Sequence, residues 1–258
     1  MEIIRTYVPN SLANYNHLVY CPTTQQAAAI DPFDANHIVD IAKKHSLTII
    51  QIWLTHEHGD HIRGLNSLRE LTGAKSFAPM TCNGLFESDI WLEDGQEVRL
   101  GKETLTHYLT PGHTPGHGVF LYQDPQLSER DFLVCADTLF NAGVGNTRSG
   151  NVSELYQTVD RLKSLLRPQT RLFPGHDYIC TNLKFVLNHF PDCEPARTTL
   201  DTVDKQTPDT RSVMRLADEY RYNPFLSLQA DWIENHDDFT HLTQKERFFE
   251  LRSRRDQW

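Results

Sequence analysis

Short runs in which hydrophobic and polar residues alternate fill the first two thirds of the chain and predict strands separated by turns. The predicted strands are 2–8, 17–21, 26–30, 48–54, 104–110, 118–122, 131–136 and 171–173, and the predicted helices are 34–45, 62–71 and 153–166. After about residue 177 the strand pattern ends, and 183–190, 212–220 and 244–251 have helical spacing with prolines between them. This pattern predicts an α/β domain over 1–176 and a small helical domain over 177–258.

The junction between the strand 48–54 and the helix from Ile62 is rich in potential metal ligands. Residues 55–61, Thr-His-Glu-His-Gly-Asp-His, place three imidazoles and two carboxylates in seven positions. His56 and His58 are two residues apart, so both point to the same side of an extended backbone. Imidazole and carboxylate suit zinc, iron, manganese or nickel, and no cysteine lies nearby to form a closed structural zinc site. The alternative is a polar surface loop, but several ligand-type residues at such a junction are rarely accidental.

Three more candidate ligands lie one to three residues after predicted strands: His113, Asp137 and His176. Ligands at the ends of several strands converge at one edge of a sheet assembly. The set is large enough for two metals. We predict that His56, His58 and His113 hold one metal, that Asp60, His61 and His176 hold the other, and that Asp137 bridges both.

Other polar residues near these strands compete for the same roles. His117 is an alternative to His113, but it begins the next strand, so we assign it outside the ligand set. Asp31 either hydrogen-bonds a metal-ligating histidine or is a turn carboxylate before Pro32. Seven further histidines lack such context, and we treat them as surface or hydrogen-bonded residues: His17, His37, His45, His107, His189, His236 and His241.

Composition limits the classes of partner. The 258 residues are 39% hydrophobic and 23% charged, and the formal net charge of -9 disfavours nucleic acid and anionic membranes. No apolar run is long enough to span a bilayer, and the N-terminus lacks the features of a signal peptide. The five cysteines form no Cys-x-x-Cys pair, which indicates free thiols in a reducing compartment. The free thiols predict a cytoplasmic protein, and we expect it to be a monomer.

The ligand residues resemble the T-H-x-H-x-D-H motif of the metallo-β-lactamase superfamily, with the later His, Asp and His in the same order. Short stretches narrow the resemblance to the glyoxalase II, or hydroxyacylglutathione hydrolase, family. They are Asp137-Thr138-Leu139-Phe140, Gly175-His176-Asp177-Tyr178, Asn182-Leu183-Lys184-Phe185, Tyr222-Asn223-Pro224-Phe225 and the ending from Leu251 to Asp256. The resemblance covers nearly the whole chain. It implies an αββα sandwich followed by a small C-terminal helical domain.

The resemblance also implies an enzyme, a binuclear metal-dependent thioester hydrolase. Its reaction would convert S-lactoylglutathione into lactate and glutathione, a step of methylglyoxal detoxification. The implied cofactors are two divalent metal ions, most simply zinc, with iron or manganese as alternatives. Such metals lower the pKa of bound water, so a metal-bound hydroxide would attack the thioester carbonyl. Asp60 and Asp137 are the implied catalytic residues among the ligands.

The resemblance places the glutathione site in the C-terminal region. By position, Arg252 and Arg255 match the family's basic residues for the glutathione carboxylate, and Tyr178 matches its tyrosine. The residues alone favour another role, in which arginines near the C-terminus of a helix interact favourably with the helix dipole. The glycine-rich loop 141–150 departs from the family, since Asn146 stands where Lys or Arg is common and Arg148 where an aromatic is common. Either the positive charge has moved two places, or the thiol carrier differs.

Two other functions compete with the hydrolase. A persulfide dioxygenase resembles this fold but uses one iron, which would leave Asp60, His61 and His176 without a second metal. The helical domain is fuller and resembles that of glyoxalase II, which argues against the dioxygenase. The second alternative is a catalytically silent binding protein on the same fold. Such a protein has no need to keep all seven ligand positions filled, which argues against it.

Overall fold

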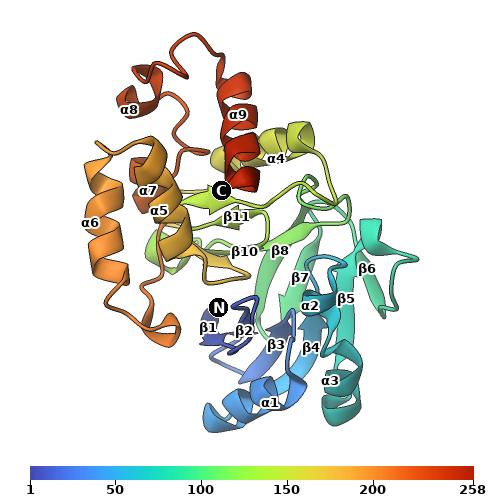
Figure 1. Ribbon diagram of the computed structural model, residues 1–258. Helices are drawn as coiled ribbons and strands as arrows, with labels where there is room; N and C mark the ends of the chain where they lie inside the picture. Colours follow the sequence, from blue (N-terminus) through green and yellow to red (C-terminus); the bar gives the residue numbers. More distant parts are fainter.

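Two β-sheets lie face to face in the computed structural model, which describes residues 1–258 (Figure 1). The first sheet has six strands in chain order, antiparallel from β1 to β3 and parallel from β3 to β6. They are β1 (Glu2–Tyr7), β2 (Tyr15–Tyr20), β3 (Gln26–Ile30), β4 (Thr48–Trp53), β5 (Lys75–Pro79) and β6 (Ile90–Leu92).

The second sheet has five strands in the order β13-β10-β9-β8-β7, and only β10 and β13 run parallel. They are β7 (Glu97–Leu100), β8 (Glu103–Leu109), β9 (Gly118–Tyr122), β10 (Phe132–Ala136) and β13 (Arg171–Pro174). The loop after β10 contains a small antiparallel hairpin of β11 (Leu139–Phe140) and β12 (Gly143–Val144). The sequence pattern over 141–150 predicts only a glycine-rich loop, because strands of two residues carry no alternation to detect.

Helices cover the outer faces of both sheets, so the predicted αββα arrangement is confirmed. Against the first sheet lie α1 (Ala35–Lys44) and α3 (Leu65–Thr72), with the short α2 (Gly59–Ile62) before α3. Against the second lies α4 (Val152–Leu165). Asp34 caps α1 by accepting a hydrogen bond from the His37 amide at 3.0 Å, as predicted. Gly73 ends α3 with a φ of 67°, which a glycine adopts without strain.

The apolar faces of the two sheets enclose one core cluster. Trp53 of β4 stacks on Phe120 of β9 with ring centroids 5.0 Å apart, and both side chains are fully buried. Burial of large aromatic surfaces fixes the distance and angle between the sheets. The strand ends that carry the candidate ligands therefore extend from a packed core.

The C-terminal third is helical: α5 (Ile179–His189), α6 (Glu194–Val203), α7 (Leu216–Tyr222), α8 (Asp231–Glu234) and α9 (Gln244–Gln257). The helix predicted over 212–220 begins only at Leu216, because the segment before it lies beside β13, where the Leu172 amide donates to the Met214 carbonyl. Helix α6 is absent from the sequence prediction, which placed Pro195 between helices. Pro195 instead lies in the first turn of α6, where its missing N–H costs nothing.

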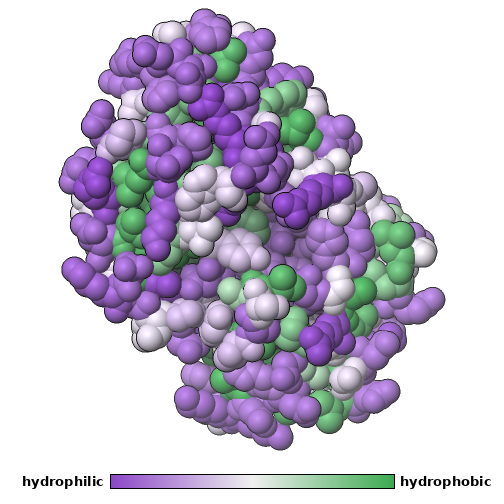
Figure 2. All heavy atoms as spheres, in the orientation of Figure 1, coloured by the Kyte–Doolittle hydropathy of each residue, from purple (hydrophilic) through white to green (hydrophobic).

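These helices share a core with the second sheet. One cluster of 29 buried residues includes Leu121 of β9, Leu155 of α4, and Phe225 and Leu251 of the C-terminal region. The division into domains at 176 and 177 therefore stays a prediction. The chain contains no helix that is both long and apolar enough to cross a membrane. The face shown in Figure 2 is largely hydrophilic, with hydrophobic residues in small separate groups.

Candidate metal centre

The first group of candidate ligands joins two strand ends from different sheets. His56 and His58 follow β4, and His113 follows β8. The Nδ1 atom of His58 lies 3.1 Å from Nε2 of His56 and 3.1 Å from Nε2 of His113. Burial is the main reason that the pKa values of His56 and His113 are lowered, which favours the neutral imidazole that binds metals.

The second group joins α2 to the end of β13. Asp60 and His61 lie in α2, and His176 follows β13. Nε2 of His61 is 3.3 Å from Nε2 of His176 and 3.4 Å from Oδ2 of Asp60. All three ligand atoms lie within 4.8 Å of one another. The structure thus brings together the second predicted set.

Asp137 lies between the two groups. Its Oδ2 is 3.2 Å from Nε2 of His176 and 3.6 Å from Nε2 of His113, and its Oδ1 is 3.5 Å from Nε2 of His61. Burial acts to raise the pKa of this carboxyl, but His176 and His61 hold it well below its usual range. An ionised carboxylate therefore faces both groups.

The donor set fits two divalent metal ions. A tetrahedral zinc ion with nitrogen ligands at about 2.0–2.1 Å separates those nitrogens by roughly 3.3 Å. Three pairs of ring nitrogens within the groups are separated by 3.1–3.3 Å: His56 and His58, His58 and His113, and His61 and His176. The Oδ1 atom of Asp137 is buried without a hydrogen-bond donor, as expected of an oxygen that faces a cation. Histidine, carboxylate and no thiol suit zinc, iron or manganese.

The ring nitrogen of each histidine that points away from its group also has a partner. Such outer contacts fix the tautomer and orientation of a metal ligand. The contacts are His56 Nδ1 to Thr55 Oγ1 (3.0 Å), His58 Nε2 to Ser149 Oγ (3.2 Å), His61 Nδ1 to Asp31 Oδ2 (2.8 Å), His113 Nδ1 to the Asn146 carbonyl (2.7 Å) and His176 Nδ1 to the Leu12 carbonyl (2.8 Å). The ring nitrogens that face inward are free for metals.

Two neighbouring carboxylates have clear structural roles. Asp31 accepts hydrogen bonds from the Thr55 amide at 2.8 Å and the Thr55 hydroxyl at 2.6 Å, besides the one from His61. Of its two expected roles, the contact with a candidate ligand is therefore the one observed. Asp60 accepts a hydrogen bond from Nδ2 of Asn14 at 2.9 Å. The turn between β1 and β2 thereby reaches the second group.

His117 lies outside both groups of ligand atoms. Its Nδ1 is 2.9 Å from the hydroxyl of Thr110 and 3.0 Å from that of Thr138, and its Nε2 accepts a hydrogen bond from the Asp137 amide at 3.3 Å. The ring stacks on His56 at 4.7 Å. His117 thus packs against one candidate ligand, His56, and accepts a hydrogen bond from the backbone of another, Asp137. None of the seven histidines set aside on sequence grounds joins a ligand group.

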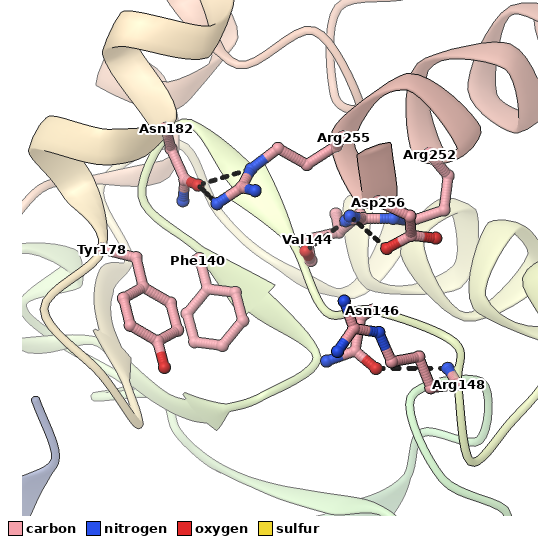
Figure 3. A pocket seen from close by; sticks show the side chains of 9 residues that line it. All are labelled: Phe140, Val144, Asn146, Arg148, Tyr178, Asn182, Arg252, Arg255 and Asp256. Atoms are coloured by element: carbon pink, nitrogen blue, oxygen red, sulfur yellow. Dashed lines mark hydrogen bonds and ion pairs between the residues drawn. The ribbon is translucent and has the colours of Figure 1, made fainter. Parts of the chain in front are cut away.

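A polar pocket opens beside the second group (Figure 3). The five residues predicted to bind substrate all line it: Asn146, Arg148, Tyr178, Arg252 and Arg255. The ring of Tyr178 stacks on His176 with centroids 4.9 Å apart and an interplanar angle of 2°, so the pocket adjoins the candidate metal centre. Phe140 packs against Tyr178 at 5.2 Å.

The three arginines of the pocket differ in what they already bind. Arg252 is 4% exposed and donates to the carbonyls of Val144 and Gly145 and to the carboxylate of Asp256. Its guanidinium thus ties α9 to β12 and to the residue after it. Arg255 donates from Nε and Nη2 to Oδ1 of Asn182, which leaves Nη1 free (Figure 3). Arg148 is exposed, and its guanidinium has no partner in the protein.

Sequence reasoning missed several residues of the site. Phe140, Val144, Asn182 and Asp256 also line the pocket, and Asn14 and Ser149 contact candidate ligands. Asn14 and Ser149 lie in connecting segments, where both residue types are common, so their sequence context gave no signal of these contacts. Asp256 was detectable, because it is four residues after Arg252 on the same helix face.

Comparisons with known proteins match both parts of the chain. A family model for the metallo-beta-lactamase superfamily matches residues 22–81 and 84–176, and one for the hydroxyacylglutathione hydrolase C-terminus matches 177–258. A hydroxyacylglutathione hydrolase from Nitrosococcus oceani is 36% identical over 268 residues, which cover 100% of both chains. The structure of ETHE1 from Myxococcus xanthus superposes with a TM-score of 0.69 and 25% identity, over 97% of this chain and 90% of that one. Another solved structure, in a di-iron-bound form, has a TM-score of 0.54 and 26% identity over 67% of this chain and 91% of that one.

Proposed function

The chain belongs to the hydroxyacylglutathione hydrolase family of the metallo-β-lactamase superfamily, and on that premise we propose that it hydrolyses hydroxyacyl-glutathione thioesters. S-lactoylglutathione is the proposed substrate, with lactate and glutathione as products. The resemblance found in the sequence motifs is confirmed by this membership.

One structural observation on this chain's own residues supports the proposal. Tyr178 lines the polar pocket and stacks on His176, so a thiol carrier bound in the pocket has its thioester beside the candidate ligands. Arg148 and Arg255 bring positive charge to the same pocket. Guanidinium groups pair with carboxylates through charge-assisted, two-pronged hydrogen bonds. Glutathione offers two carboxylates, which matches these two cations.

We propose two divalent metal ions per chain, held by the two groups and bridged by Asp137. The supporting observations are the ring-nitrogen separations of 3.1–3.3 Å and the buried, unpaired Oδ1 of Asp137. When bound, such metals supply Lewis acidity and lower the pKa of water, so thioester hydrolysis proceeds at neutral pH. Zinc is our first proposal, with iron or manganese as alternatives.

The protein's own groups orient the reactants and handle the proton. Oδ2 of Asp60 is held by Asn14, whereas its Oδ1 makes no hydrogen bond in the protein. We assign to Asp60 the acceptance of the proton that the attacking water loses. Tyr178, whose pKa burial raises to about 12, stays neutral and forms a wall of the pocket. No serine or cysteine nucleophile is needed.

Asn146 and Arg148 differ from the residues that are common in the family, and this difference affects which thiol carrier the pocket binds. Asn146 uses its backbone carbonyl to hold His113, and its Oδ1 accepts a hydrogen bond from the Arg148 amide at 3.1 Å. The guanidinium of Arg148, two residues further on, lines the same pocket without an internal partner. We propose that this charge replaces the basic residue common at position 146, so that glutathione remains the carrier.

The cysteines support a proposal for the cellular setting. All five are free, and four are buried. Buried free thiols are typical of a reducing compartment, and we propose a monomer in the cytoplasm.

The test is steady-state hydrolysis of S-lactoylglutathione, with metal content measured on the same sample purified without chelator. We expect thioester cleavage and about two metal equivalents per chain. One equivalent of iron, with oxygen uptake on a persulfide substrate, would instead indicate the dioxygenase. Metal binding without turnover of either substrate would indicate a binding protein.

A further inference from the structure

A carboxylate outside the metal centre is buried among hydrogen-bond donors. Glu219 of α7 is fully buried and forms no ion pair. Its Oε1 accepts hydrogen bonds from Nδ2 of Asn141 (2.9 Å) and from the hydroxyl of Tyr222 (2.9 Å). Its Oε2 accepts from the amide of Ala142 (2.7 Å) and from Nδ2 of Asn223 (2.9 Å). A buried charge is costly, so four donors around one carboxylate indicate a specific role.

Two of these donors belong to the turn of the hairpin β11–β12. Asn223 strengthens the same attachment, because its Nδ2 also lies within 3.3 Å of the Phe140 carbonyl and 3.2 Å of the Gly143 carbonyl. On the other side, Nδ2 of Asn182 donates to the Asn141 carbonyl at 2.9 Å. Side chains of α5 and α7, and of the residue after α7, thus hold the turn.

The hairpin needs such support. Each strand has only two residues, and isolated two-stranded hairpins are marginally stable at best. Ala142 in the turn has a φ of 57°, a left-handed conformation that costs free energy for a residue other than glycine. The amide of this residue is the one that donates to Glu219. The contact with Glu219 therefore stabilises the turn at its most strained residue.

The hairpin carries one wall of the pocket. Phe140 and Val144 line it, and Asn146 and Arg148 follow directly (Figure 3). From this arrangement we infer that Glu219 is a positioning residue, which sets the hairpin wall of the thiol-carrier pocket without touching substrate. The inference rests on the proposed function. It adds that binding of the carrier depends on a carboxylate in the helical region.

The test compares two substitutions of Glu219 in the full-length, metal-loaded protein at about pH 8. Glu219→Met keeps the length of the side chain but removes both acceptors. Glu219→Gln keeps one oxygen that accepts hydrogen bonds from Ala142 and Asn223. The new amide nitrogen can donate to Oδ1 of Asn141 after the side-chain amide of Asn141 flips. Glu250→Met is the matched control, because Glu250 is a half-exposed carboxylate that pairs only with Arg254 in the same helix.

Two measurements are made on each variant. Amide hydrogen exchange over 139–146 should accelerate roughly tenfold in Glu219→Met and stay near the wild-type rate in Glu219→Gln and Glu250→Met. KM for S-lactoylglutathione should rise roughly three- to tenfold in Glu219→Met, the effect of about one hydrogen bond, with kcat and metal content unchanged. The S-lactoyl thioester of N-acetylcysteamine, a small neutral thiol, should be hydrolysed equally by all four proteins.

The outcomes separate this inference from the proposed function. A wild-type protein that does not cleave S-lactoylglutathione contradicts the function, and the exchange measurement still decides the role of Glu219. Wild-type exchange over 139–146 in Glu219→Met, or an unchanged KM in an enzyme that does cleave, overturns the inference. If Glu219→Met does not fold, Asn223→Ala replaces it, with the same expected changes and the same overturning results.

Discussion

The imidazole of His113 donates from Nδ1 to the backbone carbonyl of Asn146 at a distance of 2.7 Å. Asn146 also lines the pocket, so a single loop residue contacts both a candidate metal ligand and the proposed substrate site. Ser149 of the same loop contacts His58. Substitutions in this loop can therefore alter substrate binding and metal binding together, and the two effects must be measured separately.

The first prediction concerns the proposed bridge. Asp137→Ala should lower metal content below two equivalents and activity by at least about a hundredfold, because the carboxylate faces His61, His113 and His176 at 3.2–3.6 Å. Elemental analysis and thioester hydrolysis on one sample test this. Asp160→Ala, an exposed carboxylate of α4, is the control. Full occupancy with full activity in Asp137→Ala would show that the bridge is wrongly assigned.

The second prediction separates the arginines of the pocket. Arg148→Ala and Arg255→Ala should each raise KM for S-lactoylglutathione roughly ten- to a hundredfold with kcat and metal content unchanged, since each loses a charge-assisted contact worth about 1.5–3 kcal/mol. Arg252→Ala should also lower stability, because its guanidinium holds the Val144 and Gly145 carbonyls.

A neighbouring arginine provides the matched control for these variants. Arg254 pairs with Asp238 and Glu250 and lies outside the pocket. Arg254→Ala should therefore leave KM at the wild-type value. A wild-type KM in both Arg148→Ala and Arg255→Ala would mean that the substrate carries no carboxylate into this pocket.

The third prediction concerns the β1–β2 turn. Asn14→Ala removes the hydrogen bond to Oδ2 of Asp60, and loss of such an outer contact typically weakens metal affinity about 10–100-fold. The second group should then release its metal to a chelator at lower chelator concentration than in the wild type. Asn36→Ala, an exposed residue of α1, should release metal as the wild type does. Equal release from Asn14→Ala would show that Asn14 does not support the ligand.

The seven candidate ligands were predictable because their pattern is local. Four of them lie within residues 56–61, and the other three lie one to four residues after strands whose apolar runs are clear in the sequence. The structure brings all seven together at the strand ends. The αββα arrangement followed from the same strands and from the family resemblance.

The contacts that support this centre could not be predicted in the same way. Asn14 and Asp60 are 46 residues apart, and His58 and Ser149 are 91 apart, so neither contact leaves a local pattern. The hairpin β11–β12 is formed by tertiary contacts rather than by strand propensity, because its turn is bonded to Glu219 of α7. Sequence periodicity reports which face of an element is buried, whereas these polar contacts depend on the finished packing.

The last prediction is a dependence of stability on pH that Glu219 imposes. Burial raises the pKa of Glu219 to about 7, although its four hydrogen-bond donors oppose the change. The other titratable groups that face it, Tyr222 and Cys135, stay neutral near pH 7, because burial, together with the Glu219 charge, raises their pKa values as well. A raised carboxyl pKa in the folded state contributes stability that is complete below the unfolded pKa of about 4.5 and is lost as pH rises through about 7.

Glu219→Gln cannot titrate, so the comparison with wild type isolates this contribution. Between pH 5 and pH 8.5 the free energy of unfolding of the wild type should fall relative to that of the variant by about 2.5 kcal/mol. All other titratable groups are identical in the two proteins, so their contribution cancels in the difference. Denaturant unfolding of both proteins at both pH values measures the difference in their free energies of unfolding. If the difference in unfolding free energy between the two proteins is the same at pH 5 and pH 8.5, the prediction is wrong. Glu219 would then not change its protonation between these conditions in the folded protein.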